Sequence, residues 1–151
     1  GLGLCLGMDV IDVPGATGYV DTNFEGKADA AIEALRAHDL VYVHVEATDE
    51  VSHEQNAKAK VKAIEDFDSR LIARVLDAVG PDVNAVVLPD HPVPVKTGRH
   101  TRVPVPVAVR MAGVPPDGVL TYDEASCLRG SLGAMKGPDL MNLLFGRPDG
   151  A

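Results

Sequence analysis

Aspartate and histidine recur together at two places in the sequence, with spacings that suit metal binding. Asp49 precedes His53 by four residues, and Asp90 stands directly before His91. His100 follows His91 by nine residues. Carboxylate oxygens and neutral imidazole nitrogens are the ligands that Zn²⁺, Mn²⁺ or Fe²⁺ take in proteins. These five residues are therefore candidate metal ligands.

Each of these patterns alone has a simpler interpretation. Aspartate favours turns and helix starts, so Asp49 also fits a turn cap and Asp90 an ordinary turn. His100 alone also fits a solvated side chain. The coincidence of the three patterns is what favours a metal site. If Asp90 and His91 end an extended strand, their side chains point to opposite sides, which suggests two different ions.

The candidate ligands follow two predicted strands. Residues 40–45 and 85–88 are β-branched and aliphatic runs of strand length, and 10–13 has the pattern of a further buried strand. A polar loop is expected at 46–52, and a proline-rich loop follows 88. Ligands in open α/β sheets bind beyond the carboxyl ends of strands, so these loops are the expected site. His44, inside the run at 40–45, is expected to be a hydrogen-bonded core residue.

Helices are predicted between these strands. Thr22 and Glu25 have the spacing of a capping box before an Ala-rich helix at 27–37. Apolar residues recur at three- and four-residue steps across 56–79, which predicts a long helix that Gly80 ends.

Two weaker signals follow towards the end of the chain. The Val and Pro alternation at 103–109 fits a sheet edge, and a cap at Thr121 and a helix at 138–144 complete the pattern. Strands alternating with helices predict an α/β fold, a mostly parallel sheet flanked by helices on both faces.

The composition is that of a folded domain and excludes two kinds of partner. The chain has 151 residues, 46% hydrophobic and 24% charged, which suits one domain with a sizeable core. Its formal charge is −8 and it has no basic cluster, so no nucleic-acid partner is expected. No apolar run is long enough to span a membrane, and the amino end lacks the charged and apolar regions of a signal peptide, so a cytoplasmic protein is expected. With only two cysteines, far apart in the sequence, reduced thiols are expected.

Several segments resemble a known enzyme family. They are VYVHVEATDEVSHE at 41–54, VVLPDHPVP at 86–94 and GRHTRVPVPVAV at 98–109, supported by VPGATGYVDTNFEGKADAAIEAL at 13–35 and KAIEDFDSRL at 62–71. Together they resemble the carboxyl-terminal part of cofactor-independent phosphoglycerate mutases of the archaeal-type branch, in the alkaline phosphatase superfamily. The resemblance implies that 1–151 is the carboxyl-terminal part of an alkaline phosphatase-like metal-binding domain, a three-layer sandwich.

The resemblance also implies a two-metal site. Asp49, His53 and His100 are expected to hold one ion, and Asp90 and His91 belong to the second. Manganese is the usual metal, with Zn²⁺, Mg²⁺ or Co²⁺ as alternatives. The family completes the second site with an aspartate and a nucleophilic serine that have no match here, so both are expected upstream of this chain and no catalytic residue within it. Ser52 is not expected to be the nucleophile, because nothing supplies it with a base.

The substrate that the resemblance implies is a phosphorylated small molecule, phosphoglycerate. The phosphoryl group of 3-phosphoglycerate passes to the serine and returns at the other hydroxyl, while both ions stabilise the charged transition state. Other phosphoryl-transfer enzymes of the superfamily are the alternative, such as homoserine kinase-like proteins, phosphopentomutases or phosphodiesterases. A non-catalytic metal-binding fragment is a further alternative. The sequence predicts no oligomeric state.

Overall fold

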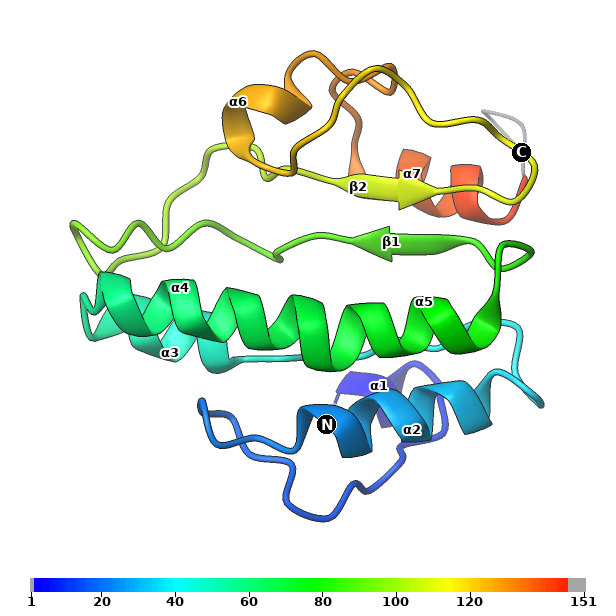
Figure 1. Cartoon of the computed structure of the whole chain (residues 1–151), viewed down its shortest axis with the longest axis horizontal. Helices are drawn as coiled ribbons and strands as arrows, with labels where there is room; N and C mark the ends of the chain where they lie inside the picture. Colours follow the sequence, from blue (N-terminus) through cyan, green and yellow to red (C-terminus); the bar gives the residue numbers. More distant parts are fainter. Residues whose placement is uncertain (1, 147–151) are drawn as a thin grey trace. The chain divides into compact units, whose positions relative to one another are not determined.

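The structure is a computed structural model that describes residues 2–146 (Figure 1). The chain forms two compact units. Of the described residues, the first unit comprises 2–79 and 93–99, and the second comprises 80–92 and 100–146. Asp49 and His53 therefore belong to the first unit, and the other three candidate ligands belong to the second. Among the described residues, no helix has the length and apolar character needed to cross a bilayer.

The first unit is helical. Its elements are α1 (Leu2–Cys5), α2 (Phe24–Ala34), α3 (Ala47–His53), α4 (Ala57–Asp66), the π-helix η1 (Phe67–Ile72) and α5 (Ala73–Val79). The last three form one uninterrupted helix (Figure 1), which confirms the helix predicted at 56–79. Asn56 caps its start by accepting a hydrogen bond from the backbone N–H of Ala59 at 3.0 Å. Gly80, with a φ of 69°, follows its end.

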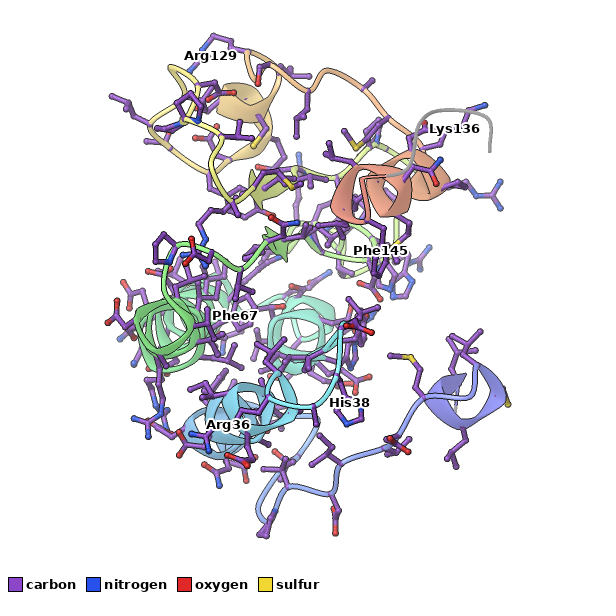
Figure 2. All side chains as sticks on the ribbon, turned by 90° about the vertical axis from the view of Figure 1, so that its right-hand side faces the viewer. Arg36, His38, Phe67, Arg129, Lys136 and Phe145 are labelled. Atoms are coloured by element: carbon purple, nitrogen blue, oxygen red, sulfur yellow. The ribbon has the colours of Figure 1, made fainter. Side chains whose placement is uncertain are left out.

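The core of this unit lies between α2, α3 and the long helix. Its buried members are Phe24, Ala28, Ala47, Val51, Ala63 and Leu71. Figure 2 looks nearly along these helices and labels Phe67, which packs against the cluster from the long helix. Small alanines allow the helices to approach closely, while Phe24 and Leu71 fill the space between them. Burial of these apolar side chains stabilises the unit.

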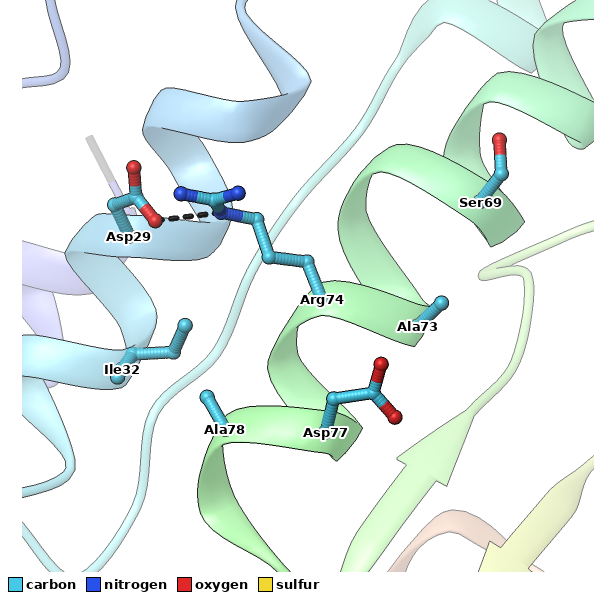
Figure 3. Close-up of a pocket in the computed structure, with 7 residues that line it drawn as sticks. All are labelled: Asp29, Ile32, Ser69, Ala73, Arg74, Asp77 and Ala78. Carbon is cyan, nitrogen blue, oxygen red and sulfur yellow. Dashed lines mark hydrogen bonds and ion pairs between the residues drawn. The ribbon is translucent and has the colours of Figure 1, made fainter.

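Ion pairs add to the packing between α2 and the long helix. The Arg70 guanidinium donates to both carboxylate oxygens of Glu25, at 2.6 and 2.8 Å, and lies 5.0 Å from the centre of the Phe24 ring. These hydrogen bonds lower the pKa of Glu25 from 4.5 to about 2. Arg74 donates to Asp29 at 2.6 Å, at the rim of a surface pocket (Figure 3).

The start of α2 differs from the prediction. The helix begins at Phe24, earlier than expected, and its N-cap is Asn23, whose side chain accepts from the Gly26 N–H at 2.9 Å. Thr22, the predicted cap, instead accepts a hydrogen bond from the Thr17 N–H at 3.0 Å. An asparagine next to the threonine is an equally good cap, so the spacing alone identified the wrong residue.

Two of the predicted strands do not form. Residues 10–13 and 40–45 have no strand pairing, and Val10 is 63% exposed. In 40–45, Val43 and Val45 pack on the core, whereas Tyr42 is exposed and stacks with the likewise exposed ring of His44. The prediction of a buried core His44 is therefore wrong. A strand needs a backbone partner as well as the right residues, and neither segment has one among residues 2–146.

The second unit contains the sheet of the described residues. Its strands β1 (Ala85–Val87) and β2 (Ala108–Arg110) pair antiparallel, with Val86 opposite Val109. The strand predicted at 85–88 is confirmed. The predicted mostly parallel sheet, covered by helices on both faces, is not what the described residues form. Pro104 and Pro106 lack the N–H needed for the ladder, which limits β2 to the end of its Val and Pro segment.

Two short helices complete this unit. Helix α6 (Glu124–Cys127) is capped by Asp123, which accepts from the Ser126 N–H at 2.7 Å, rather than by the predicted Thr121. Helix α7 (Gly137–Leu144) confirms the prediction at 138–144. The Asn84 side chain donates to the Leu144 carbonyl at 3.2 Å, which ties the end of α7 to the start of β1.

Candidate metal centre

Asp49 and His53 lie on helix α3, not in a loop. The prediction of a polar loop at 46–52 is wrong, because Ala47 and Val51 bury one side of this segment in the core as a helix. Residues four apart share a helix face, so the D-x-x-x-H spacing brings the two side chains together. Their nearest atoms, Asp49 Oδ2 and His53 Nε2, are 3.2 Å apart.

The contact made by the other ring nitrogen of His53, Nδ1, indicates where the neutral ring carries its proton. Nδ1 lies 2.8 Å from the carbonyl oxygen of Gly98. A carbonyl only accepts hydrogen bonds, so Nδ1 carries the proton and the neutral ring has its lone pair on Nε2. This lone pair and the Asp49 carboxylate are both acceptors, and they need a proton or a cation between them.

The distance between these two acceptors fits a shared divalent ion. Metal bonds of about 2.1 Å place two ligands of one ion about 3.0 to 3.4 Å apart, for octahedral and tetrahedral angles respectively. The observed 3.2 Å lies within this range. Asp49 and His53 are also only partly buried, with side chains 25% and 38% exposed, so an ion has access. The pair thus has the chemistry and the spacing of two metal ligands.

The three remaining candidates lie close together in the second unit. Asp90 and His91 occupy a bend after β1, with His91 Nε2 3.4 Å from Asp90 Oδ2. Their predicted orientation to opposite sides is therefore wrong, because the alternation of side chains holds only for extended backbone. The rings of His91 and His100 stack with their centres 3.8 Å apart. A backbone hydrogen bond from Thr101 to Pro92, 3.0 Å long, joins the two segments.

The surroundings of α3 leave Ser52 outside the site. Ser52 is fully buried, and its hydroxyl donates to the Thr48 carbonyl at 2.5 Å. Next to His53, Glu54 accepts a hydrogen bond from the Tyr19 hydroxyl, and this bond raises the pKa of Tyr19. The loop that carries Tyr19 is thereby tied to the end of α3.

One participant in the site, the carbonyl oxygen of Gly98, could not be predicted from the sequence. Backbone atoms contribute to a site without any residue-type signature, so no motif search finds them. The available clue was a glycine after a proline-rich stretch. Gly98 has a φ of 59°, a conformation that other residues rarely adopt.

Helix α3 carries a carboxylate and an imidazole on one face, and the second unit holds a group of one aspartate and two histidines. These side chains place the chain in the class of candidate divalent-metal proteins. The chain belongs to the Metalloenzyme superfamily, whose family model matches residues 3–147. The match covers nearly all the described residues, in both units.

Curated relatives carry more specific names. The chain is 53% identical over 148 residues to a 2,3-bisphosphoglycerate-independent phosphoglycerate mutase of Methanosarcina acetivorans, covering 95% of this chain and 37% of the relative. A probable enzyme of the same name from Geobacter sulfurreducens is 45% identical, covering 97% of this chain and 38% of the relative. The chain thus spans well under half the length of these relatives.

A solved structure has the same fold over this region. The structure of the PH0037 protein from Pyrococcus horikoshii matches with a TM-score of 0.92 and 32% sequence identity. The match covers 96% of this chain and 44% of that protein. At this identity and coverage, the shared fold agrees with membership of one superfamily.

Proposed function

We propose that this chain supplies most of the two-metal site of a phosphoglycerate mutase, which interconverts 3-phosphoglycerate and 2-phosphoglycerate. The observation that carries the proposal is the Asp49 and His53 pair, 3.2 Å apart, with the far ring nitrogen of His53, Nδ1, 2.8 Å from the Gly98 carbonyl oxygen. The pair occurs in a chain 53% identical to a protein named as such a mutase. The geometry supports a metal site, and the similarity supports the substrate.

In this proposal the first ion is held by Asp49, His53 and His100, which offer one carboxylate oxygen and two imidazole nitrogens. Chain connectivity supports the grouping. His53 is hydrogen-bonded to the carbonyl of Gly98, and His100 is only two residues further along the chain. Two residues span at most about 7 Å, so His100 cannot lie far from that carbonyl.

Asp90 and His91 are the proposed ligands of the second ion. The stacking of His91 on His100 supports two neighbouring ions, because one ring from each ligand set lies in contact. The remaining ligands and the serine nucleophile have no match in this chain, and the proposal assigns them to a longer polypeptide. There, residues 10–13 and 40–45 are expected to join a mostly parallel sheet.

Divalent ions bound at these residues would stabilise negative charge on phosphoryl oxygens, and Mn²⁺ is the proposed ion. The chain's own contribution is to hold the donors in place before an ion arrives. Helix α3 sets the spacing of Asp49 and His53, and the Gly98 carbonyl orients the ring of His53 so that Nε2 faces Asp49.

A chimeric enzyme tests the proposed function. This chain replaces the matching segment of the Methanosarcina acetivorans relative, and conversion of 3-phosphoglycerate is followed in an enolase-coupled assay with Mn²⁺. We expect activity in the chimera and its loss in the same chimera carrying Asp49→Asn, with both proteins folded by circular dichroism.

Other results of this assay would contradict the proposal. A folded, manganese-loaded chimera that converts another phosphorylated metabolite but not phosphoglycerate would indicate a different phosphoryl-transfer enzyme. A chimera with no activity on any substrate of such a panel would favour a non-catalytic metal-binding chain.

A further inference from the structure

The loop at 93–98 approaches the carboxyl end of helix α3 unusually closely. A Cβ atom added to Gly98 would lie 2.9 Å from the His53 carbonyl oxygen, 3.2 Å from Gln55 Cγ and 3.4 Å from the Ser52 carbonyl oxygen. The first contact involves backbone and is too short for a real Cβ. Gly98 also has a φ of 59°, in the left-handed region. Both the backbone conformation and the close approach therefore require glycine here.

The position of the Gly98 carbonyl is fixed by contacts that do not involve the His53 ring. The N–H groups of Thr97 and Gly98 both donate to the Pro94 carbonyl, at 3.0 and 2.9 Å, which closes a tight turn. At the start of the loop, Val93 is buried, and its carbonyl accepts from Lys60 Nζ at 2.9 Å. The loop is thus held to the long helix at one end and against α3 at the other.

A carbonyl held in this way selects one tautomer of the neutral imidazole. Gly98 O accepts from His53 Nδ1 at 2.8 Å, which fixes the proton on Nδ1 and limits rotation of the ring. Nε2 is then directed at Asp49 Oδ2, 3.2 Å away. Free histidine favours the opposite tautomer, with the proton on Nε2, where it would block a metal.

We infer that Gly98 is a positioning residue whose carbonyl presets His53 for metal binding. The residue acts through His53 and touches no metal itself. Its value for metal binding rests on the proposed function, whereas its effect on the tautomer of His53 does not. The absence of a side chain at position 98 is what allows the carbonyl to come within reach of the ring.

The test compares two glycine substitutions in the full chain. Gly98→Ala adds the clashing Cβ, whereas Gly133→Ala is a matched control, since Gly133 has a φ of 64° but no atom within 4 Å of an added Cβ. The imidazole ¹⁵N shifts of His53, recorded at about pH 8, report which ring nitrogen carries a proton in the metal-free protein. Calorimetry then measures the dissociation constant for Mn²⁺.

We expect His53 to carry its proton on Nδ1 in the wild type and in Gly133→Ala, and to lose this preference in Gly98→Ala. The Mn²⁺ dissociation constant should rise about 10- to 100-fold in Gly98→Ala only, as for other residues that orient a metal ligand. A proton on Nε2 in the wild type would overturn the inference. So would a folded Gly98→Ala protein with the wild-type tautomer and affinity.

Two other outcomes are covered: a Gly98→Ala protein that does not fold, and proteins that do not bind Mn²⁺. If Gly98→Ala does not fold, Gly98→Asn takes its place, because asparagine tolerates a positive φ but still carries the Cβ. If the wild type has the Nδ1 proton and Gly98→Ala loses it, but neither protein binds Mn²⁺, the proposed function fails while the positioning role stands.

Discussion

At the scale of single residues, the contact between Asp49 and His53 is open to two interpretations. It is an ion pair if the imidazole is protonated on both nitrogens, and a ligand pair if a cation lies between the two side chains. The Gly98 carbonyl does not distinguish these states, because it accepts a proton from Nδ1 in both. Measuring Mn²⁺ binding by substituted proteins distinguishes the ion pair from the ligand pair.

His38 provides a control for His53, because it too lies near an aspartate. His38 Nε2 is 3.8 Å from Asp9 Oδ2 at an exposed position (Figure 2). We expect His53→Ala to raise the Mn²⁺ dissociation constant by at least about 100-fold, since it removes a ligand rather than a group that orients one. His38→Ala should leave the constant unchanged. Calorimetric titration measures both, and equal losses in the two variants would show that the site is misplaced.

The candidate ligands could be predicted from sequence to the extent that residue type and spacing decide their chemistry. The spacing of Asp49 and His53 pairs them on any helix, even though a loop was predicted there. The orientation of Asp90 and His91 could not be predicted, because it depends on a backbone bend that no residue type specifies. The part played by Gly98 depends on a tertiary contact, which lies beyond the reach of local patterns.

At the scale of secondary structure elements, helices were easier to predict than strands. The periodicity across 56–79 and the glycine after it are local signals, and the helix that they predict is present. The π-helix within it is not visible in the periodicity. The segments 10–13 and 40–45 have the residue types of strands, but pairing is a non-local property and they lack partners among the described residues.

The ion pair between α2 and the long helix predicts a pH-dependent stability. Because Arg70 lowers the pKa of Glu25 from 4.5 to about 2, folding favours the charged carboxylate. The contribution of this pair to the free energy of unfolding is fully present above pH 4.5 and is lost as the pH falls towards about 2. Glu25→Gln should therefore lose stability less steeply over this range than the wild type.

Urea unfolding followed by circular dichroism between about pH 5 and pH 3 measures the two slopes. Glu33→Gln serves as the control, because it removes a carboxylate from an exposed pair with Arg36 on the same part of the chain. That variant should keep the slope of the wild type. Identical slopes for Glu25→Gln and the wild type would show that the Arg70 contact contributes nothing to the acid response.

At the scale of the whole molecule, the formal charge of −8 provides a second explanation for any effect of a divalent cation. Cations gather around an acidic protein and reduce its self-repulsion without occupying a site. A specific site and this general screening both raise the melting temperature, so stabilisation by Mn²⁺ alone does not distinguish them. A substitution that removes a metal ligand and preserves the net charge distinguishes the specific site from general screening.

His53→Ala is such a substitution, because the neutral histidine contributes nothing to the formal charge. We expect Mn²⁺ to raise the melting temperature of the wild type, with a gain of about 2.7 kcal/mol in the free energy of unfolding at 100 times the dissociation constant. EDTA should reverse the effect. The rise should be largely absent in His53→Ala, because only screening remains there. Calorimetric melting at constant ionic strength measures the difference, and an equal rise in both proteins would assign the effect to surface charge and argue against a built metal site.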